Sequence, residues 1–134
     1  MNKKIISLTL LISLSPVAQA ADAVSALKAY IPFFEHSGVN DRYQRCSLDI
    51  YRKPGGAVMV DFISGKIHKF LVTPELPYKL DYNYLKISQP SFPENGGMVT
   101  MSLVFEERTV KIERELCVEN RCWSSTMECS LDRW

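Results

Sequence analysis

Apolar and polar side chains alternate along most of the chain after its first third. The run 46–51 places an apolar or half-buried type at every second position, which is the period of a strand with one buried face. The turn-forming residues 53–56 end this run, and Gly65 separates two further apolar runs at 58–63 and 67–72. The pattern predicts a strand and then a hairpin in which Gly65 takes a positive φ.

Further alternating runs follow toward the C-terminus. The tyrosines of 78–84 recur with a period of two, which predicts a strand with the tyrosines on one face. A glycine-containing break at 94–97 precedes the run 99–105, and the polar residues 106–109 precede the run 110–118. About seven short strands separated by turns favour a mainly β fold, either an antiparallel sandwich or a small open barrel.

A single helix is expected before the strands. Asp22 is a residue type that caps helix N-termini. Three apolar positions follow it at helical spacing: Val24, Leu27 and Ile31. Pro32 would end the helix, and residues 33–40 are interpreted as a connection into the first strand. We therefore predict one short N-terminal helix.

Both faces of the predicted hairpin are apolar. If the turn holds two central residues, one face carries Val58, Val60, Phe62 and Leu71, and the other carries Met59, Ile63, Phe70 and Val72. A strand with one solvated face would not show this pattern. We expect the helix to cover the second face, and the alternative is that this face binds a partner.

The first twenty residues have the features of a secretory signal. Residues 1–20 combine an early lysine pair, an apolar run at 5–14 and small residues at 18–20. We predict that they are removed, and that 21–134 forms a single β-rich extracytoplasmic domain, periplasmic or secreted. No later apolar run approaches the ~20 residues of a membrane-spanning helix, so the domain is not expected to span a membrane.

The charge of the chain argues against nucleic acid as a partner. The full chain has a formal charge of +1, and loss of the signal would remove two lysines and no acidic residue, leaving −1. The lysines and arginines also form no cluster larger than a pair. Nucleic-acid binding normally requires a basic face, so this class of partner is excluded.

Four cysteines in an exported chain are expected to form disulfides. If 119–120 is a two-residue hairpin loop, Cys117 lies opposite Cys122 at a Cα distance that a disulfide tolerates. That pairing leaves Cys46 to join Cys129 and close a long loop. The rival pairing, Cys46 with Cys117 and Cys122 with Cys129, remains open at this point.

Few residues are available for catalysis. With only His36 and His68 in the chain, no histidine-rich metal cluster can form, and no metal or cofactor is expected. The predicted hairpin register sets His68 diagonal to Asp61 on one face, which would allow a general base. No nucleophile motif accompanies this pair, so the chain is not expected to be an enzyme, and a small hydrolase is the least favoured hypothesis.

The function class that remains is binding. Aromatic side chains on a rigid sheet and exposed turns provide contact area, whereas Trp123 is expected to pack as core over the disulfide of Cys122. The predicted partner contacts are Lys53, Tyr78, Tyr82, Tyr84 and Asn95. We predict a periplasmic or secreted protein that docks a protein partner, as an inhibitor or immunity protein against a cell-envelope enzyme. The alternative is a structural or assembly subunit of the envelope that forms a homo-oligomer through the apolar hairpin face.

Overall fold

The computed structural model describes residues 22–132, which form one α-helix and nine strands. The helix is α1 (Ala23–Tyr30), and a short 3-10 turn, η3, covers Pro54–Gly56. The strands are β1 (Glu35–Val39), β2 (Arg45–Arg52), β3 (Val58–Ser64), β4 (Lys66–Val72), β5 (Tyr78–Asp81), β6 (Tyr84–Glu94), β7 (Gly97–Glu106), β8 (Thr109–Val118) and β9 (Arg121–Leu131).

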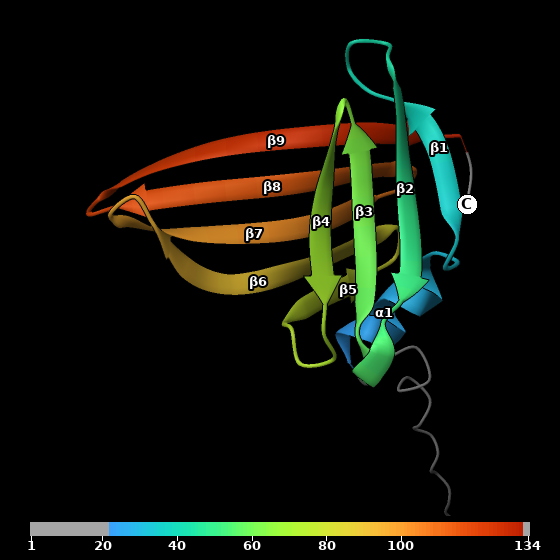
Figure 1. Cartoon of the computed structure of the whole chain (residues 1–134), viewed down its shortest axis with the longest axis horizontal. Helices are drawn as coiled ribbons and strands as arrows, with labels where there is room; N and C mark the ends of the chain where they lie inside the picture. The colour runs from blue at the N-terminus through green and yellow to red at the C-terminus, as the bar shows by residue number, and fades with distance from the viewer. Residues whose placement is uncertain (1–21, 133–134) are drawn as a thin grey trace, which may run out of the picture.

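All nine strands belong to one antiparallel sheet with the order β4-β3-β2-β1-β9-β8-β7-β6-β5. The sheet curls into a half-barrel, so that β2–β4 cross in front of β6–β9 (Figure 1). The predicted mainly β, disulfide-stapled fold with one short N-terminal helix is confirmed. Of the two predicted architectures, the continuous sheet corresponds to the open barrel, with nine strands in place of about seven.

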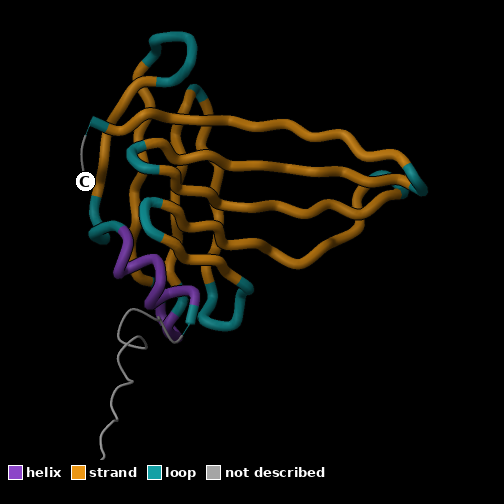
Figure 2. The backbone as a smooth tube through the Cα atoms, turned by 180° about the vertical axis from the view of Figure 1, so that it is seen from behind, coloured by secondary structure: helices purple, strands orange, loops and turns teal. Residues whose placement is uncertain are grey.

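The helix begins and ends close to the predicted positions. The side chain of Asp22 accepts a hydrogen bond from the backbone N–H of Ser25 at 2.8 Å, which caps the first turn. Leu27 is fully buried and belongs to the same core cluster as Phe62 of β3 and Phe105 of β7. The helix therefore packs against the core at one end of the curled sheet (Figure 2). The predicted signal at 1–20 lies outside the described residues.

The first strand was not predicted. Residues 35–39 lie inside the segment 33–40 that was interpreted as a connection, but they pair with β2 along their whole length. The inward-facing positions of β1 are His36 and Gly38, both buried. Because neither is a typical apolar strand residue, the buried alternation was invisible in the sequence.

The predicted strand over 78–84 is two strands. Asp81 pairs with Tyr84, so Tyr82 and Asn83 form the turn between β5 and β6, and Asn83 has φ 62°. The expectation that the tyrosines share one face is therefore wrong, since Tyr82 is a turn residue. Asparagine tolerates this left-handed conformation better than most residues, which is how a run of strand formers can turn here.

The β3–β4 hairpin differs from its predicted register by one residue. Gly65 has the predicted positive φ, 80°, but it is the only residue between the paired Ser64 and Lys66. Asp61 therefore lies opposite Lys69, where Phe70 was expected. A shift of one residue moves every side chain of the second strand to the other face.

This shift changes which residues of β4 share the buried face of the hairpin with Val58, Val60 and Phe62. The inner face carries Val58, Val60, Phe62, Phe70 and Val72, all buried in the core cluster with α1. The outer face carries Met59, Ile63, Ile67 and Leu71, with Ile67 and Leu71 exposed. The expectation that the helix covers the second apolar face is wrong, because helix and core lie on the inner side.

Both disulfides have the favoured connectivity. Cys46 is joined to Cys129, and Cys117 to Cys122 across the predicted two-residue loop that follows the Val118–Arg121 pair. The rival pairing is thereby excluded. Within residues 22–132, no helix has the length and the apolar character needed to cross a bilayer.

Candidate functional site

The predicted partner contacts do not form one surface. Tyr78 packs partly buried against the core, and Tyr84 is half-buried at the start of β6. Tyr82 is 92% exposed in the β5–β6 turn, whereas Lys53 is exposed between β2 and η3. Asn95 lies in the β6–β7 turn, at the far end of the long strands in Figure 1. These positions therefore cannot all contact one small epitope.

The feature that the sequence did not predict is a projecting arm. The four strands β6–β9 extend well beyond the layer formed by β2–β4 (Figures 1 and 2). We define the arm as residues 89–101 and 114–125, which are paired in both hairpins except at the turns and at an irregularity in β6 between Gln89 and Phe92. In its outermost strand, β9, residues 121–126 are exposed at every position. Both faces of this part of the strand are therefore open to solvent.

Apolar side chains form a row across the strands on each face of the arm at its tip. The strand register sets one row on the core-facing side, made of Phe92, Val99, Leu116 and Trp123. A second row on the opposite side is made of Pro93, Met98, Cys117 and Cys122. Trp123 is 52% exposed and Met98 is 46% exposed. The tip thus presents apolar surface on both sides of a single sheet layer.

Trp123 was expected to be core over the neighbouring disulfide, and this expectation is wrong. Adjacent strand residues point to opposite faces, so Trp123 lies on the other side of the sheet from Cys122. The guanidinium carbon of Arg121 lies 5.7 Å from the centroid of the indole ring, within the range of a cation–π contact. The signal in the sequence was the position of Trp123 directly after Cys122 in the strand that follows the 119–120 loop, because neighbouring strand residues point to opposite faces.

Several covalent and polar contacts fix the conformation of the tip. The Cys117–Cys122 disulfide joins β8 to β9 next to their turn, with Cα atoms 4.0 Å apart. Arg114 of β8 forms an ion pair with Glu94, which directly precedes the β6–β7 turn. Asn95 in that turn has φ 49°, a conformation that asparagine tolerates. At the tip, β8 is therefore linked to β9 by the disulfide and to β6 by the ion pair.

A candidate metal-ligand set lies on the same tip. Glu115, Cys117 and Cys122 have donor atoms within 4.8 Å of one another. Metal binding by cysteine requires the thiolate, and both sulfurs here form the disulfide. In the oxidised protein these residues are therefore a structural staple, with the carboxylate of Glu115 beside it.

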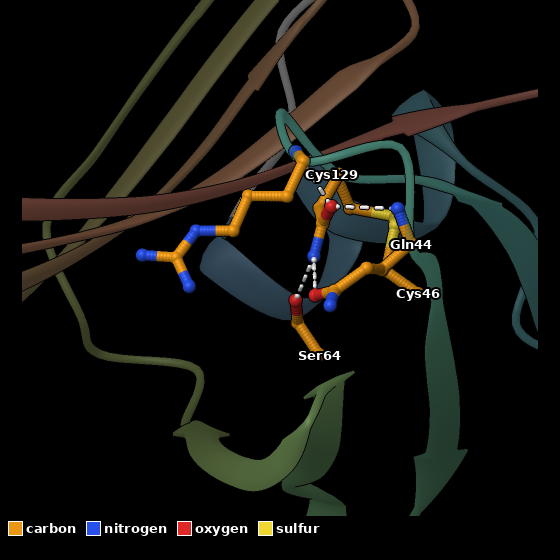
Figure 3. Close-up of a disulfide and its surroundings, with 6 residues drawn as sticks. Gln44, Cys46, Ser64 and Cys129 are labelled. Carbon is orange, nitrogen blue, oxygen red and sulfur yellow. Dashed lines mark hydrogen bonds between the residues drawn. A yellow bond between two sulfur atoms is a disulfide. The ribbon is translucent and has the colours of Figure 1, made fainter.

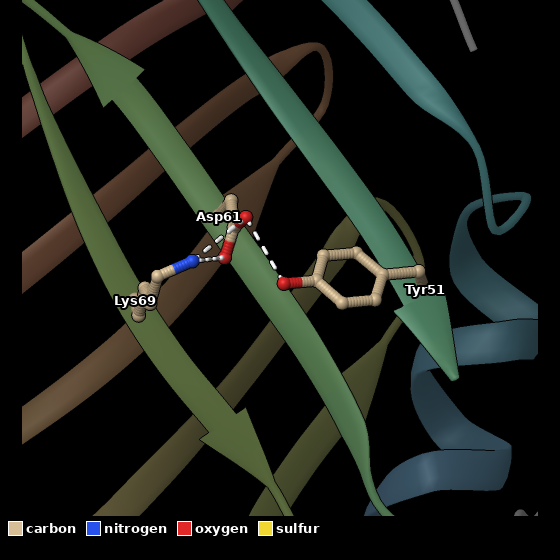
Figure 4. Close-up of polar contacts among 3 residues, drawn as sticks. All are labelled: Tyr51, Asp61 and Lys69. Atoms are coloured by element: carbon tan, nitrogen blue, oxygen red, sulfur yellow. Dashed lines mark hydrogen bonds and ion pairs between the residues drawn. The ribbon is translucent and has the colours of Figure 1, made fainter. Parts of the chain in front are cut away.

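The second polar cluster lies on the outer face of β2–β4. The hydroxyl of Tyr51 donates to the carboxylate of Asp61 at 3.1 Å, and the ammonium of Lys69 lies 3.1 Å from both carboxylate oxygens (Figure 4). The hydrogen bond to Asp61 raises the pKa of Lys69 above its ordinary value. The cluster is a charge-compensated surface contact across three strands.

The predicted Asp61–His68 pair does not form. His68 lies opposite Phe62 on the inner side of the hairpin, whereas Asp61 lies on the outer side. The imidazole ring is edge-on to the ring of Phe62, with centroids 6.5 Å apart. Its Nε2 atom is buried without a hydrogen-bond partner among the described residues. The expectation of a general base oriented by Asp61 is therefore wrong.

A hollow of about 1050 Å³ lies between the end of α1 and the β5–β6 and β7–β8 turns. Tyr30, Tyr82 and Arg108 are among the residues that line it. The hydroxyl of Tyr30 donates to the carbonyl of Glu107 at 3.4 Å, and burial raises the pKa of Tyr30. Arg108 donates to the carbonyl of Asp132 at 3.0 Å. These two hydrogen bonds thus connect the β7–β8 turn to α1 and to the residue that follows β9.

The β1–β2 loop is organised beside the long disulfide. The side-chain oxygen of Asn40 accepts hydrogen bonds from the backbone N–H groups of Arg42 and Gln44, at 2.8 Å and 3.0 Å. Its amide nitrogen donates to Ser64 at the end of β3 at 3.1 Å (Figure 3). This loop is therefore held against the hairpin, close to Cys46 and Cys129.

The arm tip and the outer face of β2–β4 are thus two surfaces on which exposed apolar side chains lie close together along paired strands. Comparisons with models of protein families, with curated proteins and with solved structures found no significant match to this chain.

Proposed function

We propose that this protein is an exported binding protein that docks a protein partner of the cell envelope through the tip of its arm. Its proposed action is that of an inhibitor or immunity protein against an envelope enzyme, without catalysis of its own. The two disulfides are compatible with a periplasmic or extracellular location, where such bonds persist. The claim that residues 1–20 direct export is part of this proposal.

The observation that carries the proposal is the exposed Trp123 on a disulfide-closed hairpin. Trp and Arg are enriched among residues that dominate binding energy, and Arg121 stacks on the Trp123 ring. About half of the surface of Trp123 is exposed, 52%, although large apolar residues are usually buried. A partner that covers this side chain would recover the hydrophobic free energy that the isolated fold leaves unused.

The rigidity of the tip also favours binding. A side chain on a mobile loop must be ordered when a partner binds, and this ordering reduces affinity. The Cys117–Cys122 disulfide and the Arg114–Glu94 ion pair restrict the tip before any partner arrives. Asn95, one of the predicted contacts, lies in the adjoining turn. A narrow, preordered projection of this kind suits a concave site such as the cleft of an enzyme.

A capture experiment with two matched variants tests the proposal. Mature, oxidised protein would be immobilised and exposed to an envelope extract of the source organism, and stoichiometric partners identified by mass spectrometry. Trp123→Ala and Tyr82→Ala each remove one exposed aromatic side chain, at opposite ends of β6–β9. We expect Trp123→Ala to weaken capture of the partner by about 30-fold or more, the range of a binding hot spot, and Tyr82→Ala to leave it unchanged.

The reverse result would contradict the proposal. If Tyr82→Ala abolished capture and Trp123→Ala did not, the partner surface would be the hollow near α1. If the captured partner is an enzyme, a stoichiometric amount of the domain should lower its activity, and Trp123→Ala should restore it. Thermal melting of both variants would establish that each is folded before capture is compared.

A further inference from the structure

The two disulfides differ in their access to solvent. Cys46 and Cys129 are 3% and 0% exposed and belong to the core cluster, so their sulfur atoms are shielded from dissolved thiols. Cys122 is exposed and Cys117 is half-buried, and both lie at the tip of the arm. Thiol–disulfide exchange depends on access to the sulfur that is attacked. The short link is therefore the one that can exchange with thiols while the protein stays folded.

The place of the short disulfide in the sheet makes its two sulfur atoms unequal. The bond runs across the strands, because Cys117 of β8 lies directly opposite Cys122 of β9. A thiolate attacks in line with the S–S bond, so it reaches Cys122 from beyond β9 and Cys117 from over β7. β9 is the outermost strand of the arm, since among the described residues it pairs with β1 only at Ser130 and Leu131 (Figure 1). The approach over β7 passes Met98, which lies opposite Cys117, so Cys122 is the more accessible sulfur.

A carboxylate lies beside both sulfur atoms of this disulfide. A carboxylate oxygen of Glu115 and the sulfur atoms of Cys117 and Cys122 all lie within 4.8 Å of one another. Glu115 is exposed and forms no ion pair within the described part of the chain. The lysine on the same face of the arm strands, Lys86, is already paired with Glu113 at 3.8 Å. The disulfide is therefore next to an unpaired negative charge.

The arginines of the arm tip do not neutralise this carboxylate. Arg114 and Arg121 occupy strand positions on the core-facing side, so their side chains leave the sheet on the opposite face from Glu115. Arg114 forms an ion pair with Glu94, and the guanidinium of Arg121 lies over the ring of Trp123. A thiolate that approaches the disulfide is therefore repelled by Glu115, and a positive charge on the same thiol is attracted.

We propose that the Cys117–Cys122 disulfide is a thiol-exchange site at which Glu115 selects thiols that carry a positive charge. The attacking thiolate sulfur bonds to Sγ of Cys122, the S–S bond breaks, and its electron pair leaves on Sγ of Cys117, which then takes a proton from water. The incoming sulfur is oxidised and Cys117 is reduced, so the products are a mixed disulfide and a thiol. The exchange removes the covalent link between β8 and β9 at the tip. The inference goes beyond the proposed function, because no binding partner takes part in it.

Two small thiols of opposite charge test the selectivity. Cysteamine carries an ammonium group and mercaptoethanesulfonate carries a sulfonate, and each would react with the folded, oxidised protein at low salt. Initial rates would be measured by mass spectrometry after quenching with N-ethylmaleimide. We expect Glu115→Gln to lower the ratio of the cysteamine rate to the sulfonate rate at least about threefold, the size of a charge interaction over a few ångströms in water. Glu128→Gln makes the same charge change on β9, about 20 Å from Cys122, and should leave the ratio unchanged.

The position of the adduct tests the direction of attack. Trypsin cleaves after Arg121 and so separates Cys117 from Cys122, which lets mass spectrometry assign each modification to one cysteine. At short reaction times we expect the cysteamine adduct on Cys122 and the maleimide on Cys117. Met98→Ala removes the side chain on the approach to Cys117, and it should increase the share of the adduct found there.

Three results would overturn the inference: equal rate ratios in wild type and Glu115→Gln, adducts mainly on Cys117, or opening of the Cys46–Cys129 link as fast as the short one. If Glu115→Gln fails to fold, the wild-type ratio in about 1 M salt replaces it, because screening should lower the ratio and an unchanged ratio would be equally contradictory. A capped peptide with Lys-Cys-Lys at its centre distinguishes the source of the thiol. Faster reaction than cysteamine would assign the site to a protein cysteine, and slower reaction to a small thiol.

Discussion

The Cα atoms of Cys46 and Cys129 lie 6.0 Å apart, although β1 separates their strands in the sheet order. Strands two positions apart in a flat sheet are about 9–10 Å apart. The sheet therefore bends sharply at β1, where Gly38 pairs with both Cys46 and Leu131. Both cysteines are buried, so the disulfide closes this bend on the core side.

Loss of the long disulfide should cost more stability than loss of the short one. Cys46 and Cys129 are 83 residues apart in sequence, whereas Cys117 and Cys122 are 5 apart. In the chain-entropy account, the two links contribute about 4.5 and about 2 kcal/mol to the free energy of unfolding. Paired Cys→Ser variants, measured by denaturant unfolding, should show this order. Equal losses would contradict the entropic explanation.

Gly38→Ala should lower the free energy of unfolding by at least about 1–3 kcal/mol, because this is the usual cost of forcing an added atom into a packed site. A Cβ at this position would overlap the backbone carbonyl of Ser130 on β9. Ser37→Ala, at the exposed neighbouring position of β1, is the matched control and should change stability little. If both variants unfolded at the same denaturant concentration as wild type, the close approach of β1 and β9 would be incorrect.

The outer-face ion pair predicts a response at alkaline pH. Asp61 raises the pKa of Lys69, and for a group with a raised folded pKa the stabilisation is fully present below the unfolded value of 10.5. This stabilisation is lost as the pH rises through the higher pKa that Lys69 has in the folded protein. Asp61→Asn should return the pKa of Lys69 toward its ordinary value in an NMR titration. The pKa of Lys111, which Glu106 raises, should not change.

Opening the short disulfide should loosen the arm tip and leave the rest of the fold intact. The Cys117–Cys122 link lies at the end of the arm, whereas the main core cluster contains Cys46 and Cys129 but neither of these residues. The Cys117→Ser/Cys122→Ser variant should show faster amide exchange in 116–123 and unchanged exchange in β2 and β3. Global acceleration of exchange would show instead that the short link supports the core.

The elements that the sequence predicted correctly rest on local chemistry. Asp22 caps the helix through a contact three residues away, and the two-residue loop brings Cys117 to Cys122 without reference to the rest of the fold. The long pairing of Cys46 and Cys129 then followed by elimination. Local signals of this kind survive in the fold because few distant contacts can override them.

The features that the sequence did not predict depend on distant contacts. β1 is a strand because it fits between β2 and β9, and its buried His36 and Gly38 carry no apolar signal. The register of β3–β4 depends on the turn conformation at Gly65, which alternation alone does not determine. The arm exists because β6–β9 are longer than the layer of β2–β4 that covers them at one end (Figure 1). The exposure of Trp123 therefore depends on where that layer ends.

The most direct test of the binding account is amide hydrogen exchange of the domain in complex with its captured partner. Free and bound domain would be compared residue by residue, which locates the covered surface without any substitution. The account predicts protection in the arm tip, at 95–99 and 117–123. Protection confined to the β5–β6 turn around Tyr82 and to Lys53, with an unchanged arm tip, would contradict it.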